Sequence, residues 1–176
     1  DKGICEYVDA ARIIRKKYPD TIFKVVGPLW QQNLKENTIT ADQVDGWVQE
    51  GIIEYIGELS DVRDAIAGCH SLVLPSYREG TSNVLLEASS MEKPCITCDT
   101  PGCREIVSHE LTGYLCKVAD AKDLADKMEM MISLTDDQRK DMGQAARRKV
   151  IKEYDKNLVV SIYLRAIDRY LNYVPD

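Results

Sequence analysis

Two carboxylates, Glu79 and Glu87, have the spacing to bind a hydroxyl-rich ligand, with a glycine and small polar residues between them. Residues 72–76 have the pattern of a buried strand and its exit, so we expect a loop that presents Glu79 and a helix that begins near Ser82. The start of such a helix offers unpaired N–H groups and a positive dipole end, which suit phosphate. A carboxylate accepts hydrogen bonds from two neighbouring hydroxyls at once, as in a ribose or hexose diol. The pattern therefore favours a nucleotide-sugar as the ligand, with its diphosphate between two carboxylates that bind sugar hydroxyls.

The composition narrows the class of protein. The chain has 176 residues, 44% of them hydrophobic and 30% charged, and a formal net charge of −6. This length suits one domain with a proper core, and the acidic balance argues against nucleic acid or an anionic membrane as the main partner. No apolar run approaches the roughly 20 residues that cross a bilayer, and no signal peptide opens the sequence. We expect a cytoplasmic protein whose longer parent is either free or peripheral at the inner face of the membrane.

The six cysteines include one Cys-x-x-Cys, at Cys95 and Cys98. These two positions fall in an expected strand, where positions i and i+3 face opposite sides of the sheet. No second cysteine pair or histidine pair completes a metal-binding pattern. We expect reduced thiols that pack as small hydrophobic groups, and no metal site.

Strand and helix patterns alternate over most of the sequence, which is typical of βαβ units with a mostly parallel sheet. We expect a Rossmann-like, doubly wound α/β fold with helices on both faces of the sheet. Thr40 with Gln43 and Thr135 with Gln138 form capping-box patterns, and each predicts a helix start. Strands are expected at residues 21–27, 52–57, 70–75, 94–98 and 114–117, with helices between them and at 124–132, 135–153 and 158–173.

The run Leu74-Pro75-Ser76-x-x-Glu79-Gly80-x-Ser82-x-x-x-x-Glu87 resembles the signature of glycosyltransferase family 4, whose members are retaining enzymes of the GT-B architecture. Lys2-Gly3 resembles the end of that family's Arg-x(4–6)-Lys-Gly segment. The resemblance implies the C-terminal, donor-binding half of an enzyme that transfers a hexose-type sugar from a nucleoside-diphosphate sugar to an acceptor hydroxyl, as in polysaccharide biosynthesis. A UDP-sugar is favoured, and no further cofactor is required. Other family landmarks follow in order at Gly27, Ile56-Gly57, residues 99–107 and residues 113–115.

The resemblance also implies a role for each matching residue. Glu79 would be the catalytic carboxylate, binding hydroxyls of the transferred sugar, and Glu87 would bind the ribose. Lys2 would contact the diphosphate together with backbone N–H groups of the loop and helix start. Residues 56–58 would border the base through backbone groups. The donor-binding residues are thus expected to be Lys2, Gly80, Thr81, Ser82, Asn83, Glu87, Ile56, Gly57 and Glu58.

Asp1-Lys2-Gly3 already leads into a helix, so we expect the first strand upstream of residue 1 and treat the chain as part of a longer protein. Residues 1–154 are expected to form the nucleotide-sugar-binding domain. Residues 155–176 are expected to form a helix that crosses toward an N-terminal, acceptor-binding domain outside this chain, after a break at Tyr154-Asp155-Lys156. We expect the isolated chain to be inactive in transfer. The apolar side of its last helix could drive self-association.

Two other functions compete with this interpretation. A dinucleotide-dependent oxidoreductase requires a Gly-x-Gly-x-x-Gly between strand and helix, and the sequence has none. A non-catalytic α/β nucleotide-binding or interaction module remains open, and binding of a nucleoside diphosphate would count against the interaction module. Some residues also have ordinary interpretations: Lys2 as a solvated terminal side chain, and Glu105 as either a pocket-closing acid or the cap of a helix that starts there.

Overall fold

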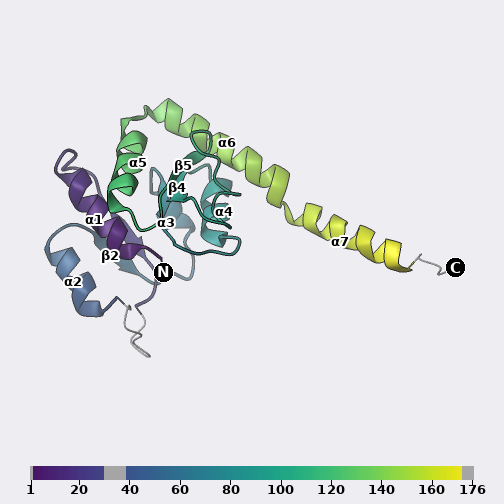
Figure 1. Cartoon of the computed structure of the whole chain (residues 1–176), viewed down its shortest axis with the longest axis horizontal. Coiled ribbons are helices and arrows are strands. Elements are labelled where there is room, and N and C mark those ends of the chain that lie inside the picture. Colours follow the sequence, from purple (N-terminus) through teal and green to yellow (C-terminus); the bar gives the residue numbers. More distant parts are fainter. Residues whose placement is uncertain (1, 30–38, 172–176) are drawn as a thin grey trace.

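The structure is a computed structural model that describes residues 2–29 and 39–171 (Figure 1). Strands β1 (Lys24–Val26) and β2 (Glu54–Gly57) pair in parallel as one sheet. Strands β3 (Leu72–Leu74), β4 (Cys95–Cys98) and β5 (Gly113–Cys116) form a second parallel sheet in that order. The predicted parallel α/β fold is confirmed. Strands β1 to β4 are shorter than predicted, and β5 has the predicted length but begins one residue earlier.

Helices cover two opposite faces of β4. Helices α1 (Ile4–Arg15) and α5 (Ala121–Ser133) contribute to one buried cluster, which also contains Ile96 and Cys98. Helices α3 (Arg63–Ala67) and α4 (Asn83–Ser90) contribute to the other, which contains Cys95. The alternation of strand side chains thus separates the two cores, as the doubly wound arrangement requires.

Four of the six cysteines pack in these cores as predicted, whereas Cys5 is exposed and Cys69 half-buried. All six thiols are free. Cys95 and Cys98 face opposite clusters, and burial raises the pKa of the Cys95 thiol to about 12. The buried thiols are Cys95, Cys98, Cys103 and Cys116, and they serve as small apolar side chains.

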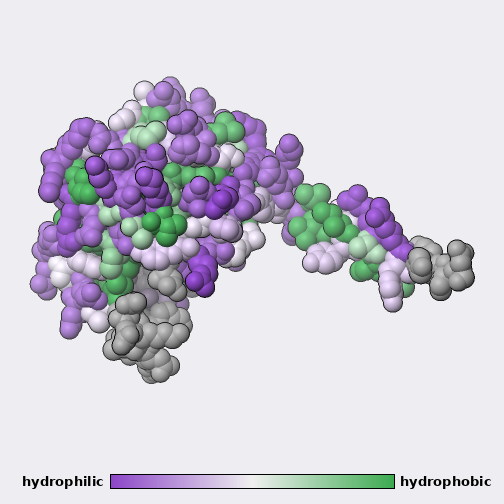
Figure 2. Space-filling model, in the orientation of Figure 1, coloured by the Kyte–Doolittle hydropathy of each residue, from purple (hydrophilic) through white to green (hydrophobic). Residues whose placement is uncertain are grey.

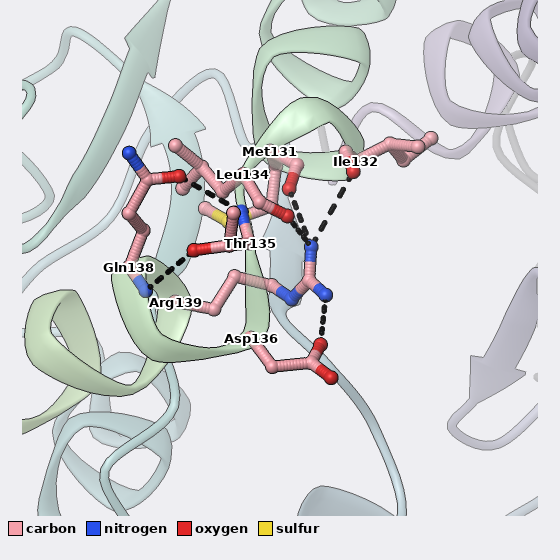
Figure 3. Close-up of polar contacts among 7 residues, drawn as sticks. All are labelled: Met131, Ile132, Leu134, Thr135, Asp136, Gln138 and Arg139. Atoms are coloured by element: carbon pink, nitrogen blue, oxygen red, sulfur yellow. Dashed lines mark hydrogen bonds and ion pairs between the residues drawn. The ribbon is translucent and has the colours of Figure 1, made fainter.

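Both predicted capping boxes are present. Thr40 opens helix α2 (Ala41–Gln49): its side chain accepts from the Gln43 N–H, and the Gln43 side chain accepts from the Thr40 N–H at 2.9 Å. Thr135 and Gln138 form the same reciprocal pair at the start of α6 (Asp136–Tyr154), as Figure 3 shows. These local hydrogen bonds satisfy N–H groups that have no intrahelical partner.

The Arg139 side chain stabilises the turn between α5 and α6 (Figure 3). Its guanidinium donates to the main-chain carbonyl oxygens of Met131 at 3.3 Å and Ile132 at 3.4 Å, and to that of Leu134. It also pairs with the Asp136 carboxylate. One side chain therefore satisfies carbonyl groups at the C-terminus of α5, where a cation also complements the helix dipole.

Arg139→Met is expected to lower the free energy of unfolding by about 1–3 kcal/mol, because the charge-assisted bonds to the end of α5 are lost. The same change at Arg148, an exposed residue of α6, is the matched control and should have little effect. Urea denaturation of the two variants and the unchanged chain measures the difference. Equal stability of the two variants would show that the Arg139 contacts contribute nothing.

Helix α7 (Lys156–Leu171) extends away from the rest of the molecule (Figure 1). The break before it is confirmed, since Asp155 ends α6 in an extended conformation. None of its described residues is buried, and apolar side chains lie along it in Figure 2. Residues 172–173 of the predicted helix lie outside the described residues. The exposed large apolar side chains of α7 are Leu158, Val159, Val160, Ile162, Tyr163, Leu164, Ile167, Tyr170 and Leu171.

Candidate functional site

The start of α1 lies against the exit of β3. Gly3 is buried and adopts a left-handed backbone conformation, with φ of 68°. A Cβ atom at this position would lie 2.1 Å from the Pro75 carbonyl oxygen, so only glycine permits this approach. A second contact joins the same two segments: the Tyr77 hydroxyl donates to the Glu6 carboxylate at 2.5 Å, which raises the pKa of Tyr77 to about 12.

This packing brings together two of the residues singled out in the sequence. The Lys2 ammonium lies 2.6 Å from a carboxylate oxygen of Glu79. The Lys2 side chain is 67% exposed, whereas that of Glu79 is only 13% exposed. Lys2 is therefore paired and not solvated alone. Because the ammonium is open to solvent, an anionic ligand can reach Lys2 and compete with Glu79 for it.

Helix α4 begins where the sequence predicts, with Ser82 as its N-cap residue in an extended conformation. Ser82 is thus the N-cap residue by position, although its hydroxyl makes no capping hydrogen bond. The side chain is instead buried, with 4% of its surface exposed. The N–H groups of the first turn thus receive no help from this side chain. Asn83 at the first helical position and Glu87 in the second turn are both exposed, as a ligand contact requires.

A pocket of about 420 Å³ opens beside the loop that carries Glu79. One wall comes from the loop after β3 and the other from the turn after β4, with an aromatic side chain from the end of α6. Two carboxylates, a hydroxyl and a phenol share this space with apolar groups, a composition that suits a hydroxyl-rich ligand. The lining residues are Glu79, Gly80, Thr81, Pro101, Gly102, Glu105, Ile106 and Tyr154.

The turn after β4 differs from the prediction. Residues 101–106 form turns and not the start of a helix, so the helix-cap interpretation of Glu105 is wrong. Its carboxylate instead accepts from the Gly102 N–H at 2.6 Å, within the turn. Burial of Cys103, Ile106 and Val107 fixes one helical turn against the core, and the chain then leaves toward Ser108.

The structure does not bring every predicted site residue into this pocket. Ile56, Gly57 and Glu58 lie at the end of β2, in the other sheet, and are not part of its lining. Also absent from the lining are Lys2 and the predicted residues at and along the start of α4, which are Ser82, Asn83 and Glu87. Among the described residues, no three His, Cys, Asp or Glu side chains are grouped so that they could hold a metal ion.

Sequence reasoning missed four residues of the pocket: Pro101, Gly102, Ile106 and Tyr154. Gly102 has φ of 85°, and a Cβ atom there would lie 1.7 Å from the Gly80 carbonyl oxygen. The Pro101-Gly102 pair after a strand is a turn signal that could have indicated this role. Nothing in the local sequence indicates that Tyr154, at the far end of α6, meets this loop.

A family model described as "Glycosyl transferases group 1" matches residues 1–133. Among curated proteins, the chain is 29% identical over 173 residues to an N,N'-diacetylbacillosaminyl-diphospho-undecaprenol alpha-1,3-N-acetylgalactosaminyltransferase of Campylobacter jejuni. The match covers 98% of this chain and 43% of that relative, so the chain spans less than half of the relative's length.

Solved structures share the fold. The C-terminal domain of a glycosyl transferase group 1 family protein, LpcC, from Francisella tularensis has a TM-score of 0.74 and 26% identity, over 88% of this chain and 80% of that one. Anabaena HepE in complex with UDP-glucose has a TM-score of 0.78 and 19% identity, over 98% of this chain and 46% of that one. No helix in the described part of the chain is both long and apolar enough to span a membrane.

Proposed function

Because the chain belongs to the glycosyl transferases group 1 family, we propose that it is the donor-binding part of an enzyme that transfers a sugar from a nucleoside-diphosphate sugar to an acceptor hydroxyl. The observation that carries this proposal is the meeting of Lys2 with Glu79 beside the open start of α4. A cation, a shielded carboxylate and a helix N-terminus in one place suit an anion attached to a polyol.

The proposed roles follow from the chemistry of each group. Lys2 and the backbone N–H groups of Gly80–Asn83 bind the diphosphate, since a charge and a helix dipole stabilise the leaving nucleoside diphosphate. Glu79 binds hydroxyls of the transferred sugar from the neighbouring loop. On donor binding, Lys2 exchanges its exposed ion pair with Glu79 for the phosphate, which leaves the carboxylate available to the sugar.

Two further predicted contacts, with the ribose and with the base, complete the proposed donor site. Glu87, exposed in the second turn of α4, binds the ribose hydroxyls. Ile56, Gly57 and Glu58 border the base through backbone groups at the carboxyl end of β2, where ligands of open parallel sheets bind.

The finer assignment is also a proposal. We place the chain in glycosyltransferase family 4, with retention at the transferred hexose and UDP as the favoured carrier. The Glu79-x(7)-Glu87 signature supports the family, and a similar fold binds UDP-glucose in Anabaena HepE. A location in the cytoplasm, or at the inner face of the membrane, agrees with diphospho-undecaprenol in the name of the Campylobacter relative.

For the domain organisation, we propose that residues 1–154 form the donor domain and that its first strand precedes residue 1 in a longer protein. The division of the described strands into a β1–β2 sheet and a β3–β4–β5 sheet supports a strand between them. Residues 155–176 would then cross to an N-terminal, acceptor-binding domain, which the exposed apolar side chains of α7 support. The chain alone would bind donor without transferring sugar, and α7 would favour its self-association.

A calorimetric titration with UDP, GDP and ADP tests the proposal and identifies the base. We expect saturable binding of one diphosphate. A non-catalytic module that acts only by protein interaction would bind none of the three. Glu87→Ala is expected to weaken the affinity about tenfold, because the carboxylate no longer accepts from the ribose.

A ligand variant makes this test specific to the ribose. The unchanged chain should bind 2′-deoxy-UDP less tightly than UDP, and Glu87→Ala should remove that preference, because the two changes delete the same contact. Glu50→Ala is the matched control, since Glu50 is an exposed acid paired with Arg12 elsewhere on the surface. An unchanged preference in Glu87→Ala would exclude the ribose role.

A further inference from the structure

We propose that the turn at residues 99–106 positions Glu79, with Gly102 and Glu105 as the residues that set the place of the Glu79–Gly80 backbone. This inference rests on the proposed function, because Glu79 is the sugar-binding carboxylate in that proposal. Neither Gly102 nor Glu105 needs to touch the donor. They act through the loop that carries Glu79.

Gly102 sets the distance between the two segments. A Cβ atom built on it would lie 1.7 Å from the Gly80 carbonyl oxygen and 2.7 Å from that of Glu79. Both neighbours are backbone atoms, so no side-chain rotation could relieve the collision. The backbone of the Glu79 loop therefore rests directly on the Gly102 backbone, and any side chain here must displace one of the two.

Glu105 holds Gly102 in that place. Its carboxylate accepts from the Gly102 N–H at 2.6 Å, a short, charge-assisted hydrogen bond that closes the turn. Gly102 has a φ of 85°, a backbone conformation that side chains rarely adopt. The hydrogen bond from its N–H to Glu105 stabilises this conformation, which the turn would lose easily without it. The same carboxylate lines the pocket beside Glu79.

The turn is rigid enough to act as a support. Cys103, Ile106 and Val107 are buried in the core between the sheet and α4, with at most 1% of each exposed. At its start, the Arg104 guanidinium donates to the Asp99 carbonyl oxygen at 2.9 Å and pairs with the Asp99 carboxylate at 3.2 Å. Displacement of Gly102 would have to disturb these contacts, so the Glu79 loop rests on a part of the fold that resists movement.

Glu79 is thus held from two sides. The Lys2 ammonium contacts its carboxylate, and Gly102 lies under its backbone. When Lys2 binds the donor diphosphate it leaves Glu79, and only the backbone contact with Gly102 still holds the Glu79 loop. The turn would then fix where the carboxylate meets the sugar, which is a positioning role and not a contact with substrate.

The test compares the affinities of the 176-residue chain for UDP-glucose and for UDP. We expect Gly102→Ala and Glu105→Ala to lower the UDP-glucose affinity about tenfold more than the UDP affinity, because UDP shares only the diphosphate contact of Gly80 and lacks the sugar contact of Glu79. Glu105→Gln keeps an oxygen that can accept from the Gly102 N–H. This variant should therefore retain most of the UDP-glucose affinity that Glu105→Ala loses. A merely structural role would weaken both ligands together.

Gly51→Ala is the matched control for backbone strain. Gly51 also has a positive φ, 73°, but a Cβ atom there would meet nothing within 4 Å. It should leave the ratio of the two affinities unchanged. An unchanged ratio in folded Gly102→Ala and Glu105→Ala would overturn the inference.

A second readout needs no ligand. In ¹⁵N–¹H spectra, Glu105→Ala should shift the amide resonances of Gly80 and Thr81, whereas Gly51→Ala should not. Unmoved Gly80 and Thr81 resonances would overturn the positioning role even if no ligand bound. A chain that bound neither UDP nor UDP-glucose would instead contradict the proposed function, with the amide shifts still deciding the role of the turn.

Discussion

Glu79→Gln in the longer protein is expected to lower the rate of sugar transfer at least about 100-fold, the scale seen when a preorganised polar contact to the reacting group is removed. The substitution keeps the size of the side chain and removes its charge, which weakens the hydrogen bonds it accepts from sugar hydroxyls. UDP affinity should not fall and should rise by at most about threefold, because Lys2 no longer has to leave its ion pair with Glu79. Initial-rate kinetics and calorimetry measure the two quantities.

The control for Glu79 is Glu50→Gln, which also removes an exposed ion pair, that with Arg12. It should change neither rate nor affinity. Parallel losses of UDP affinity and transfer in Glu79→Gln would show that this carboxylate holds the nucleotide and not the sugar. A variant that transfers sugar at the original rate would remove Glu79 from the mechanism.

Gly3→Ala is expected to lower the free energy of unfolding by about 3 kcal/mol or more, because a Cβ atom adds a backbone collision to a strained φ. The collision is with the Pro75 carbonyl oxygen, at 2.1 Å, and φ is 68°. Relief of the clash must move the start of α1 away from β3. Lys2 would move with it, so UDP affinity should fall as well.

Gly51→Ala separates strain from collision in the same experiment. It carries a similar positive φ with open space around it, and should cost about 1 kcal/mol. Urea denaturation gives the stabilities and calorimetry the affinities. Equal losses of stability in the two variants would mean that the collision of a Cβ atom at Gly3 with Pro75 adds nothing to the cost of the positive φ.

The sequence predicted features of the fold that depend on local pattern. The capping boxes at Thr40 and Thr135 form through residues three positions apart, so local chemistry alone determines them. The opposite orientation of Cys95 and Cys98 follows from the period of a strand. Strand ends were less well predicted, since regular pairing depends on the register between neighbours, and β1 and β2 are irregular between Val25 and Val26.

The site was predictable in its residue types and less so in its contacts. Glu79 and the start of α4 are near in sequence, but the ion pair with Lys2 depends on how α1 meets β3. The expected helix at Glu105 is absent: residues 101–106 form turns, and Gly102, with a positive φ, lies against the Gly80 backbone. Contacts between distant turns depend on tertiary packing, which no local spacing encodes.

The most direct test of the central claim is a ¹⁵N–¹H spectrum of the chain recorded during titration with UDP. The account predicts saturable shifts of the amide resonances of Gly80, Ser82 and Asn83, and weaker shifts with uridine, which lacks the diphosphate. Shifts confined to Tyr114 and Met130, which line a separate pocket, would contradict it. So would a spectrum that UDP leaves unchanged.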